Sequence, residues 1–153
     1  MDNMTAEEKK ELLVKELSTR FPYHVKVLEG DVLIEALECL ARISESDYVV
    51  NPVEGTDIKF RIENVKIYLR PISSMTDEEM DKLFEVLKVD LSGKTDDWIK
   101  INDVTGIKFF LPEGRWVEEL VKAYDYLNSI HIDYRGSIAA GIALEAPKDM
   151  YCL

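Results

Sequence analysis

The sequence of 153 residues is poor in cysteine, histidine and long hydrophobic runs, and each shortage excludes a class of protein. Two cysteines, Cys39 and Cys152, are too few for a disulfide framework and lack the spacing of a metal knuckle. No apolar run approaches the ~20 residues that a membrane-spanning helix needs. The first ten residues are rich in charged side chains and predict no secretion signal. We therefore expect a single domain, 1–153, that is cytoplasmic and does not contact a membrane.

Catalytic and cofactor motifs are also missing. The sequence contains no Walker loop, no dinucleotide fingerprint and no Cys-x-x-Cys pair, so we expect no cofactor and assign no catalytic residue. A Ser-His-Asp arrangement of Ser73 or Ser74 with His131 and Asp133 lacks the Gly-x-Ser-x-Gly elbow that would support it. Asp57-Ile58-Lys59 fits the acid-x-Lys pattern of metal-dependent nucleases, with Asp47 or Glu54 as the second acid. Because such a short pattern is common in a charged chain, a metal-dependent hydrolase stays an alternative and we assign no metal site.

Acidic side chains are abundant: 30 acids against 19 bases give a formal net charge of −11. Such a chain repels phosphate backbones, so we expect no direct binding to nucleic acid. Between Asp31 and Asp57, seven acids and one base give 1 − 7 = −6. In strands, many of these carboxylates would point to an outer face, which we interpret as a binding surface for a basic partner or else as ordinary solvated surface. The candidate residues are Glu35, Glu38, Glu45, Asp47, Glu54 and Asp57.

The spacing of apolar residues predicts an α+β fold with an N-terminal helix and two later amphipathic helices. Capping boxes at Thr5–Glu8 and Thr76–Glu79 start helices over about 6–20 and from Asp77 to about 91. Apolar residues at helical spacing predict the third helix over about 116–129. The tail, 133–144, is either a short helix or a packed turn followed by an extended end.

Short apolar stretches separated by turn-like clusters predict strands between residues 24 and 69. They favour a small antiparallel meander or a compact SH3-like barrel. Residues 34–41 fit strands, which we favour, or two helical turns. Residues 98–101 and 107–111 predict a β-hairpin. The chain then has two sub-lobes, 1–70 with the first helix and the strands, and 71–153 with the two amphipathic helices and the hairpin.

Two loop clusters combine tyrosine with arginine, types that are enriched at binding hot spots. The first contains Arg70 and the second contains Tyr134 and Arg135, and we take these three residues as binding candidates. The alternative is that both arginines pair with local acids and that the tyrosines pack the junction between the sub-lobes.

The same clusters carry a family resemblance. Tyr-Leu-Arg-Pro-Ile-Ser-Ser-Met-Thr (68–76), Ile-Asp-Tyr-Arg-Gly (132–136) and Gly-Ile-Ala-Leu-Glu-Ala (141–146) resemble stretches in small uncharacterised proteins that phages and prophages of gut anaerobic bacteria encode. In that group Asp-Tyr-Arg-Gly is followed by leucine, where this chain has Ser137. The resemblance covers mainly the second half of the chain and implies a viral or mobile-element origin, without a known activity.

These observations lead to three functional hypotheses. The first is a phage-type accessory protein that binds a host or virion protein through its acidic surface, without catalysis, in the host cytoplasm or carried with a virion. The second is an acidic mimic of DNA that inhibits a host nuclease or regulator, and the third is the metal-dependent hydrolase.

Overall fold

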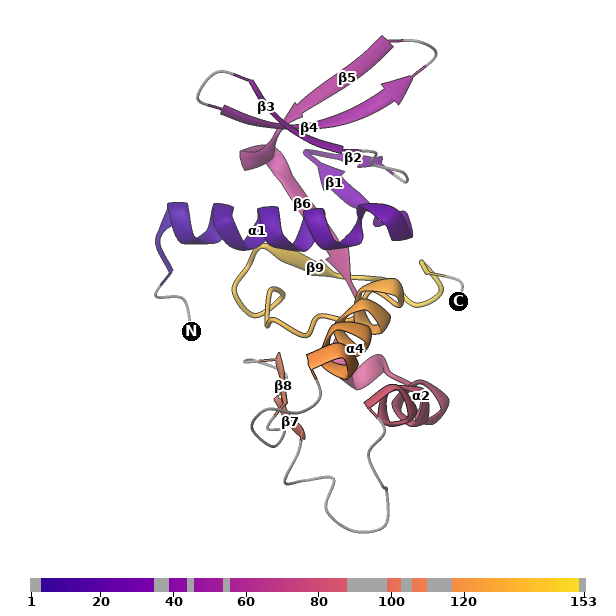
Figure 1. The fold of residues 1–153 in the computed structure, drawn as a ribbon. Helices are drawn as coiled ribbons and strands as arrows, with labels where there is room; N and C mark the ends of the chain where they lie inside the picture. The colour runs from indigo at the N-terminus through magenta and orange to yellow at the C-terminus, as the bar shows by residue number, and fades with distance from the viewer. Residues whose placement is uncertain are drawn as a thin grey trace.

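The computed structural model describes residues 4–34, 39–43, 46–53, 56–87, 99–102, 106–109 and 117–151. In these ranges it confirms the predicted α+β class (Figure 1). The helices described are α1 (Ala6–Arg20), α2 (Asp77–Leu87) and α4 (Val117–Ser129), with 3₁₀ turns η1 (Phe21–Tyr23), η2 (Ile62–Asn64) and η3 (Ile72–Ser74). The strands described are β1 (Val27–Glu29), β2 (Val32–Ile34), β3 (Cys39–Ile43), β4 (Ser46–Val53), β5 (Thr56–Arg61), β6 (Val65–Leu69), β7 (Ile99–Asn102), β8 (Gly106–Phe109) and β9 (Ala143–Glu145).

Both predicted capping boxes form. The Thr5 Oγ1 accepts a hydrogen bond from the Glu8 N–H at 3.1 Å, at the start of α1. At α2 the pairing is reciprocal, because the Thr76 Oγ1 accepts from the Glu79 N–H at 3.1 Å and the Glu79 Oε1 accepts from the Thr76 N–H at 2.9 Å. The predicted helices therefore start where the sequence places them, and the predicted end of the second helix lies outside the described residues.

The described strands form three sheets. Of the two predicted arrangements, a small antiparallel meander and an SH3-like barrel, the structure confirms the meander. β3, β4 and β5 pair antiparallel in sequence order, and the described strands do not close an SH3-like barrel. A four-stranded sheet has the order β2-β1-β6-β9, in which β9 pairs parallel with β6. β7 and β8 form the predicted hairpin. Within 34–41, strand structure is present at both ends, and 35–38 lies outside the described residues.

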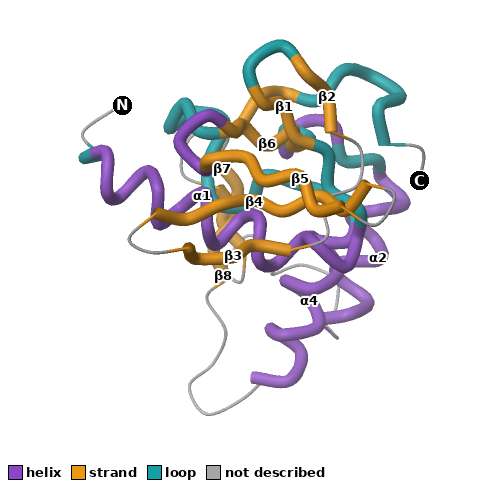
Figure 2. Tube along the Cα trace, turned by 90° about the horizontal axis from the view of Figure 1, so that it is seen from above, coloured by secondary structure: helices purple, strands orange, loops and turns teal. Residues whose placement is uncertain are grey.

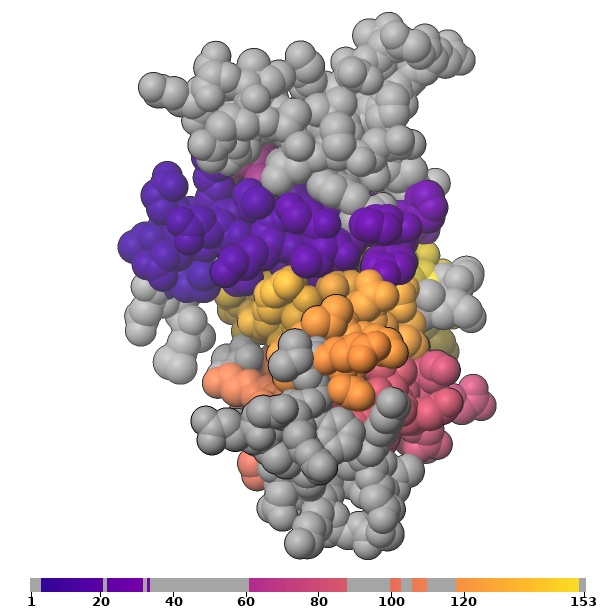
Figure 3. Space-filling view, viewed as in Figure 1, coloured from indigo at the N-terminus to yellow at the C-terminus, as the bar shows by residue number. Residues whose placement is uncertain are grey.

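The helix α1 lies across the middle of the molecule, between the meander and the C-terminal segment. It contacts β3 and β6, and the meander lies above it in the view of Figure 1 and in front of it in Figure 2. Figure 3 shows α1 as a continuous band with the C-terminal segment directly beneath it. None of the described helices is both long and apolar enough to cross a bilayer.

Two hydrophobic cores meet near residue 70. The first lies between α1 and the four-stranded sheet, and the second lies among α2, α4 and β8. The tail follows the second predicted alternative, with turns over 137–141 and then the extended strand β9. Through Ile142 and Ala143 this tail joins the first core, although it comes from the far end of the chain.

Candidate functional site

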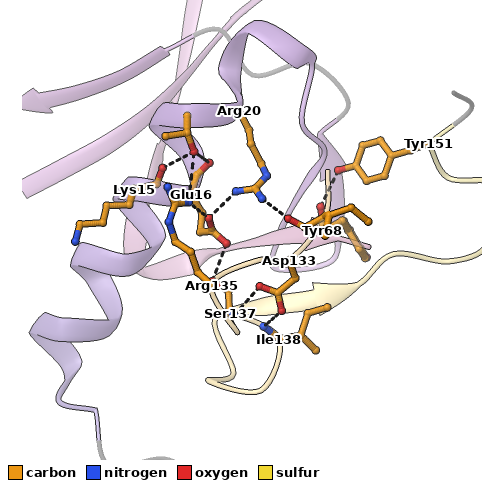
Figure 4. A network of polar contacts seen from close by, with 11 residues as sticks. Lys15, Glu16, Arg20, Tyr68, Asp133, Arg135, Ser137, Ile138 and Tyr151 are labelled. Carbon is orange, nitrogen blue, oxygen red and sulfur yellow. Dashed lines mark hydrogen bonds and ion pairs between the residues drawn. The ribbon is translucent and has the colours of Figure 1, made fainter. Parts of the chain in front are cut away.

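A buried ion cluster joins α1 to the segment after α4. Glu16 is fully buried, and its Oε1 accepts hydrogen bonds from Arg20 Nη1 at 2.5 Å and from Arg135 Nη1. Its other oxygen, Oε2, accepts from the Ser137 Oγ at 2.7 Å. Figure 4 shows the Glu16 carboxylate between the two guanidinium groups, with Ser137 on its remaining side. One carboxylate thus holds two arginines and a hydroxyl that lie far apart in the sequence.

The helical period explains why two charged residues of α1, Glu16 and Arg20, are buried. Positions 13, 16, 17 and 20 lie on one face of a helix, so Glu16 and Arg20 share the buried stripe of Leu13 and Leu17. A buried charge requires a partner, because removing a charged group from water costs on the order of several kcal/mol. Arg20 meets this requirement with Glu16 and with the Ile132 carbonyl oxygen, which accepts from its Nη2 at 2.5 Å.

Asp133 fixes the turn that presents Ser137. Its Oδ1 accepts from the Ser137 N–H at 2.7 Å, and its Oδ2 accepts from the Ile138 N–H at 3.0 Å. Burial raises the pKa of Asp133, and these two backbone bonds oppose the rise. The Nδ1 of His131 has no hydrogen-bond partner among the described residues, so Asp133 does not orient this ring and the Ser-His-Asp interpretation gains no support there.

His131 ends α4 as a cap. It has a φ of 63°, its N–H donates to the Asn128 carbonyl at 3.1 Å, and the Ile132 N–H donates to the Leu127 carbonyl at 3.1 Å. This is the Schellman arrangement, with histidine at the position that glycine usually takes. The ring stacks on Tyr151 at 3.8 Å between centroids. Burial, with Arg20, Arg70, Lys26 and His24 nearby, lowers the pKa of His131 to about 4.

Tyr134 connects the ion cluster to the hairpin. The guanidinium carbons of Arg20 and Arg135 lie 5.2 and 4.6 Å from the centre of its ring. Its carbonyl oxygen accepts from the Ile107 N–H at 2.9 Å, which fixes β8 against this segment. A Cβ on Gly106 would lie 1.9 Å from that same oxygen, and Gly106 has a φ of 90°. Only glycine permits this close approach of β8 to Tyr134.

A groove of about 660 Å³ opens beside Tyr134, between α4 and β8. We call it the α4 groove; its lining residues are Thr19, Ile107, Lys108, Val121, Tyr124, Asp125, Asn128, Tyr134 and Arg135. The Val121 side chain is 64% exposed, although it is apolar. Asn128 is only 6% exposed, and its buried Oδ1 has no hydrogen-bond partner among the residues that the structure describes. The groove therefore combines an exposed apolar side chain with a buried amide whose hydrogen-bonding capacity is unused.

Arg70, the first predicted arginine, pairs with a local acid. Its Nη2 and Nη1 donate to the two carboxylate oxygens of Glu79 at 2.7 and 2.8 Å, and Nη2 also donates to the Ser74 carbonyl at 2.9 Å. The hydrogen bond from Arg70 lowers the pKa of Glu79. The Arg70 backbone forms a parallel bridge with Ile132, so the two loop clusters lie side by side. This agrees with the alternative interpretation for Arg70, whereas Arg135 pairs with Glu16, an acid 119 positions away.

The structure describes only two of the six predicted acidic binding residues. Asp47 lies on β4 opposite Arg42, and Asp57 lies on β5 opposite Pro52. Since cross-strand partners share a face and neighbours alternate, positions 47 and 57 belong to opposite faces of the meander. Glu35, Glu38, Glu45 and Glu54 lie outside the described residues.

A metal centre does not occur among the described residues, where no three His, Cys, Asp or Glu side chains gather closely enough to hold an ion. Comparisons of the chain with protein-family models, with curated proteins and with solved structures found no match.

Sequence reasoning identified Arg70, Tyr134 and Arg135 but missed their partners. A signal for two of these partners was present, because Glu16 and Arg20 continue the spacing of Leu13 and Leu17 along one helix face. Asn128 gave no comparable signal, since a single asparagine in an amphipathic helix is ordinary.

Proposed function

We propose that this protein works by binding a partner protein, without a chemical step of its own, and that the partner docks at the α4 groove. Val121 carries this proposal, because it is the most exposed of the large hydrophobic side chains described and it lies on the wall of the groove. A single exposed hydrophobic side chain is ordinary on a protein surface, so the support comes from Val121 together with the groove, since ligand sites are concave and lined by apolar side chains.

The ion cluster supports this proposal by giving the groove a rigid base. Arg135 and Tyr134 belong both to the cluster and to the groove lining. Side chains that internal partners hold in place lose little conformational entropy when a ligand binds. The two loop clusters then act as the framework that joins the halves of the chain, and the groove acts as the contact surface.

The acidic segment between Asp31 and Asp57 is a second part of the proposal. Its net charge of −6 would attract a basic partner and increase the rate of encounter, in a manner that weakens as salt screens the charges. The resemblance to phage and prophage proteins makes a host or virion protein the expected partner.

Affinity capture with the full chain as bait tests the proposal. The lysate comes from a gut anaerobic bacterium, the kind of host that the resemblance implies, and three folded baits are compared: wild type, Val121→Glu and Leu33→Glu. Leu33 is a matched control, because it is an exposed hydrophobic residue on β2 that does not line the groove, and a glutamate there adds to the negative charge of the acidic segment instead of removing it. We expect a protein that wild type and Leu33→Glu retain and that Val121→Glu loses. Equal retention by all three baits would reject the groove as the docking site, and no retention above background would reject the binding function.

A further inference from the structure

The strongest indication of a ligand in the α4 groove is the side-chain amide of Asn128. A buried amide oxygen without a donor costs about 1–3 kcal/mol, and such groups are rare in folded proteins. The amide lines the groove, and neither its oxygen nor its nitrogen forms a hydrogen bond with a described residue. A ligand in the groove can supply the missing partner.

Arg135 adds unused donors. Its Nη1 donates to Glu16 and, at 3.5 Å, to the Thr19 Oγ1, whereas its Nε and Nη2 donate to no described residue. Glu16 is shared by Arg20 and Arg135, so the three groups carry 2 − 1 = +1 in formal charge. The Arg135 side chain is 22% exposed and lines the groove.

The remaining polar groups of the groove are also suited to an anion. Burial and the neighbouring Tyr134 raise the pKa of Tyr124, so its hydroxyl keeps its proton and can donate it. Lys108 brings a second positive charge to the lining. The one acid of the lining, Asp125, already accepts a hydrogen bond from the Tyr23 hydroxyl. The charged residues of the lining, Lys108, Arg135 and Asp125, sum to 2 − 1 = +1 in formal charge, on a chain whose net charge is −11.

We infer that the α4 groove binds a carboxylate joined to an apolar group, and this inference rests on the proposed binding function. The ligand is the C-terminal carboxylate of a partner chain that ends in an apolar residue. Arg135, Tyr124 and the Asn128 amide would bind the carboxylate and the last peptide group. Ile107 and Val121 would contact the terminal side chain. A monoanion matches the formal charge of +1 that Lys108, Arg135 and Asp125 give the groove lining, and the apolar walls favour a carboxylate over a phosphate.

Nuclear magnetic resonance titration of the full ¹⁵N-labelled chain tests this inference through the side-chain amide signals of Asn128. The probes are N-acetyl-leucine, N-acetyl-leucinamide, acetate and inorganic phosphate. We expect N-acetyl-leucine to shift the Asn128 signals saturably and to bind at least tenfold more tightly than each of the other three. Equal binding of the leucinamide, or tighter binding of phosphate, would overturn the assignment of a carboxylate.

Variants locate the site, and peptides identify the source of the carboxylate. Tyr124→Phe and Asn128→Leu should each weaken N-acetyl-leucine at least fivefold, whereas Lys100→Gln, on the neighbouring strand of the same hairpin, should not. Unchanged binding in both groove variants would place the ligand elsewhere. A hexapeptide acid ending in leucine should bind at least as tightly as N-acetyl-leucine, and its C-terminal amide should not. Clearly weaker binding of the peptide acid would assign the groove to a free small carboxylate instead.

The two proposals fail separately. A captured protein that Val121→Glu loses, together with no binding of N-acetyl-leucine, would leave the docking function standing and overturn the carboxylate site. Saturable binding of N-acetyl-leucine without any captured protein would overturn the docking function and, with it, the partner terminus as the occupant.

Discussion

Replacing Glu16 with glutamine should destabilise the protein strongly, because it removes the negative charge between the fully buried Arg20 and the partly exposed Arg135. The carboxylate is fully buried and accepts three hydrogen bonds, two of them from guanidinium groups. Glutamine keeps the volume but leaves Arg20, which is also fully buried, without a counter-charge. Breaking a buried ion pair in this way costs about 3–5 kcal/mol. We expect a loss of about 3 kcal/mol, since the glutamine oxygen still accepts one hydrogen bond.

Urea unfolding at pH 7, followed by circular dichroism at 222 nm, measures this loss. Glu11→Gln is the control, because Glu11 is an exposed acid on the same helix, and it should change the free energy of unfolding by less than about 0.5 kcal/mol. The variants should share one slope of free energy against urea, which shows that the same fold unfolds.

A double-mutant cycle with Arg135→Gln separates the interaction energy of Glu16 with Arg135 from the general destabilisation that each substitution causes. If Glu16 and Arg135 stabilise each other, the double variant should lose at least about 1 kcal/mol less than the sum of the two single losses. A loss below about 1 kcal/mol for Glu16→Gln, or strict additivity in the cycle, would refute the view that this cluster holds α1 to the C-terminal segment.

Three further predictions concern single positions. Burial lowers the pKa of His131 from 6.5 to about 4, so between these pH values the unfolded chain binds a proton that the folded chain does not. The free energy of unfolding should therefore keep its full value above pH 6.5 and fall by up to about 3 kcal/mol towards pH 4. His131→Asn should flatten this dependence by nearly one proton in urea unfolding across that range, and an unchanged slope would contradict the assignment. Gly106→Ala should cost at least about 2 kcal/mol, because alanine adds left-handed strain to a clash with the Tyr134 carbonyl, and a melting temperature within a degree of wild type would contradict that contact. Asn128→Leu should raise stability by about 1 kcal/mol while it weakens ligand binding, since leucine replaces an amide whose buried oxygen has no hydrogen-bond partner among the described residues. A loss of stability in thermal unfolding would mean that the amide has a structural role.

The local structure of this protein was predictable because it depends on residues within a few positions of one another. Each capping box joins a hydroxyl and a carboxylate three residues apart, and the observed bonds at Thr76 and Glu79 follow that spacing. The hairpin β7–β8 likewise pairs strands that only a short connection separates. The parallel pairing of β9 with β6 had no such signal, because its partners lie more than 70 positions apart.

The candidate site divides in the same way. The sequence by itself determined that Tyr134 and Arg135 stand together after a helix, and that Glu16 lies on the apolar face of another helix. Only the tertiary structure decided that these residues meet, that Arg135 pairs with Glu16 and that the side-chain oxygen of Asn128 beside them finds no hydrogen-bond partner in the described part of the chain. The physical reason is that capping and helical period act along the chain, whereas a charge or an amide becomes costly or useful only through what the folded chain places around it.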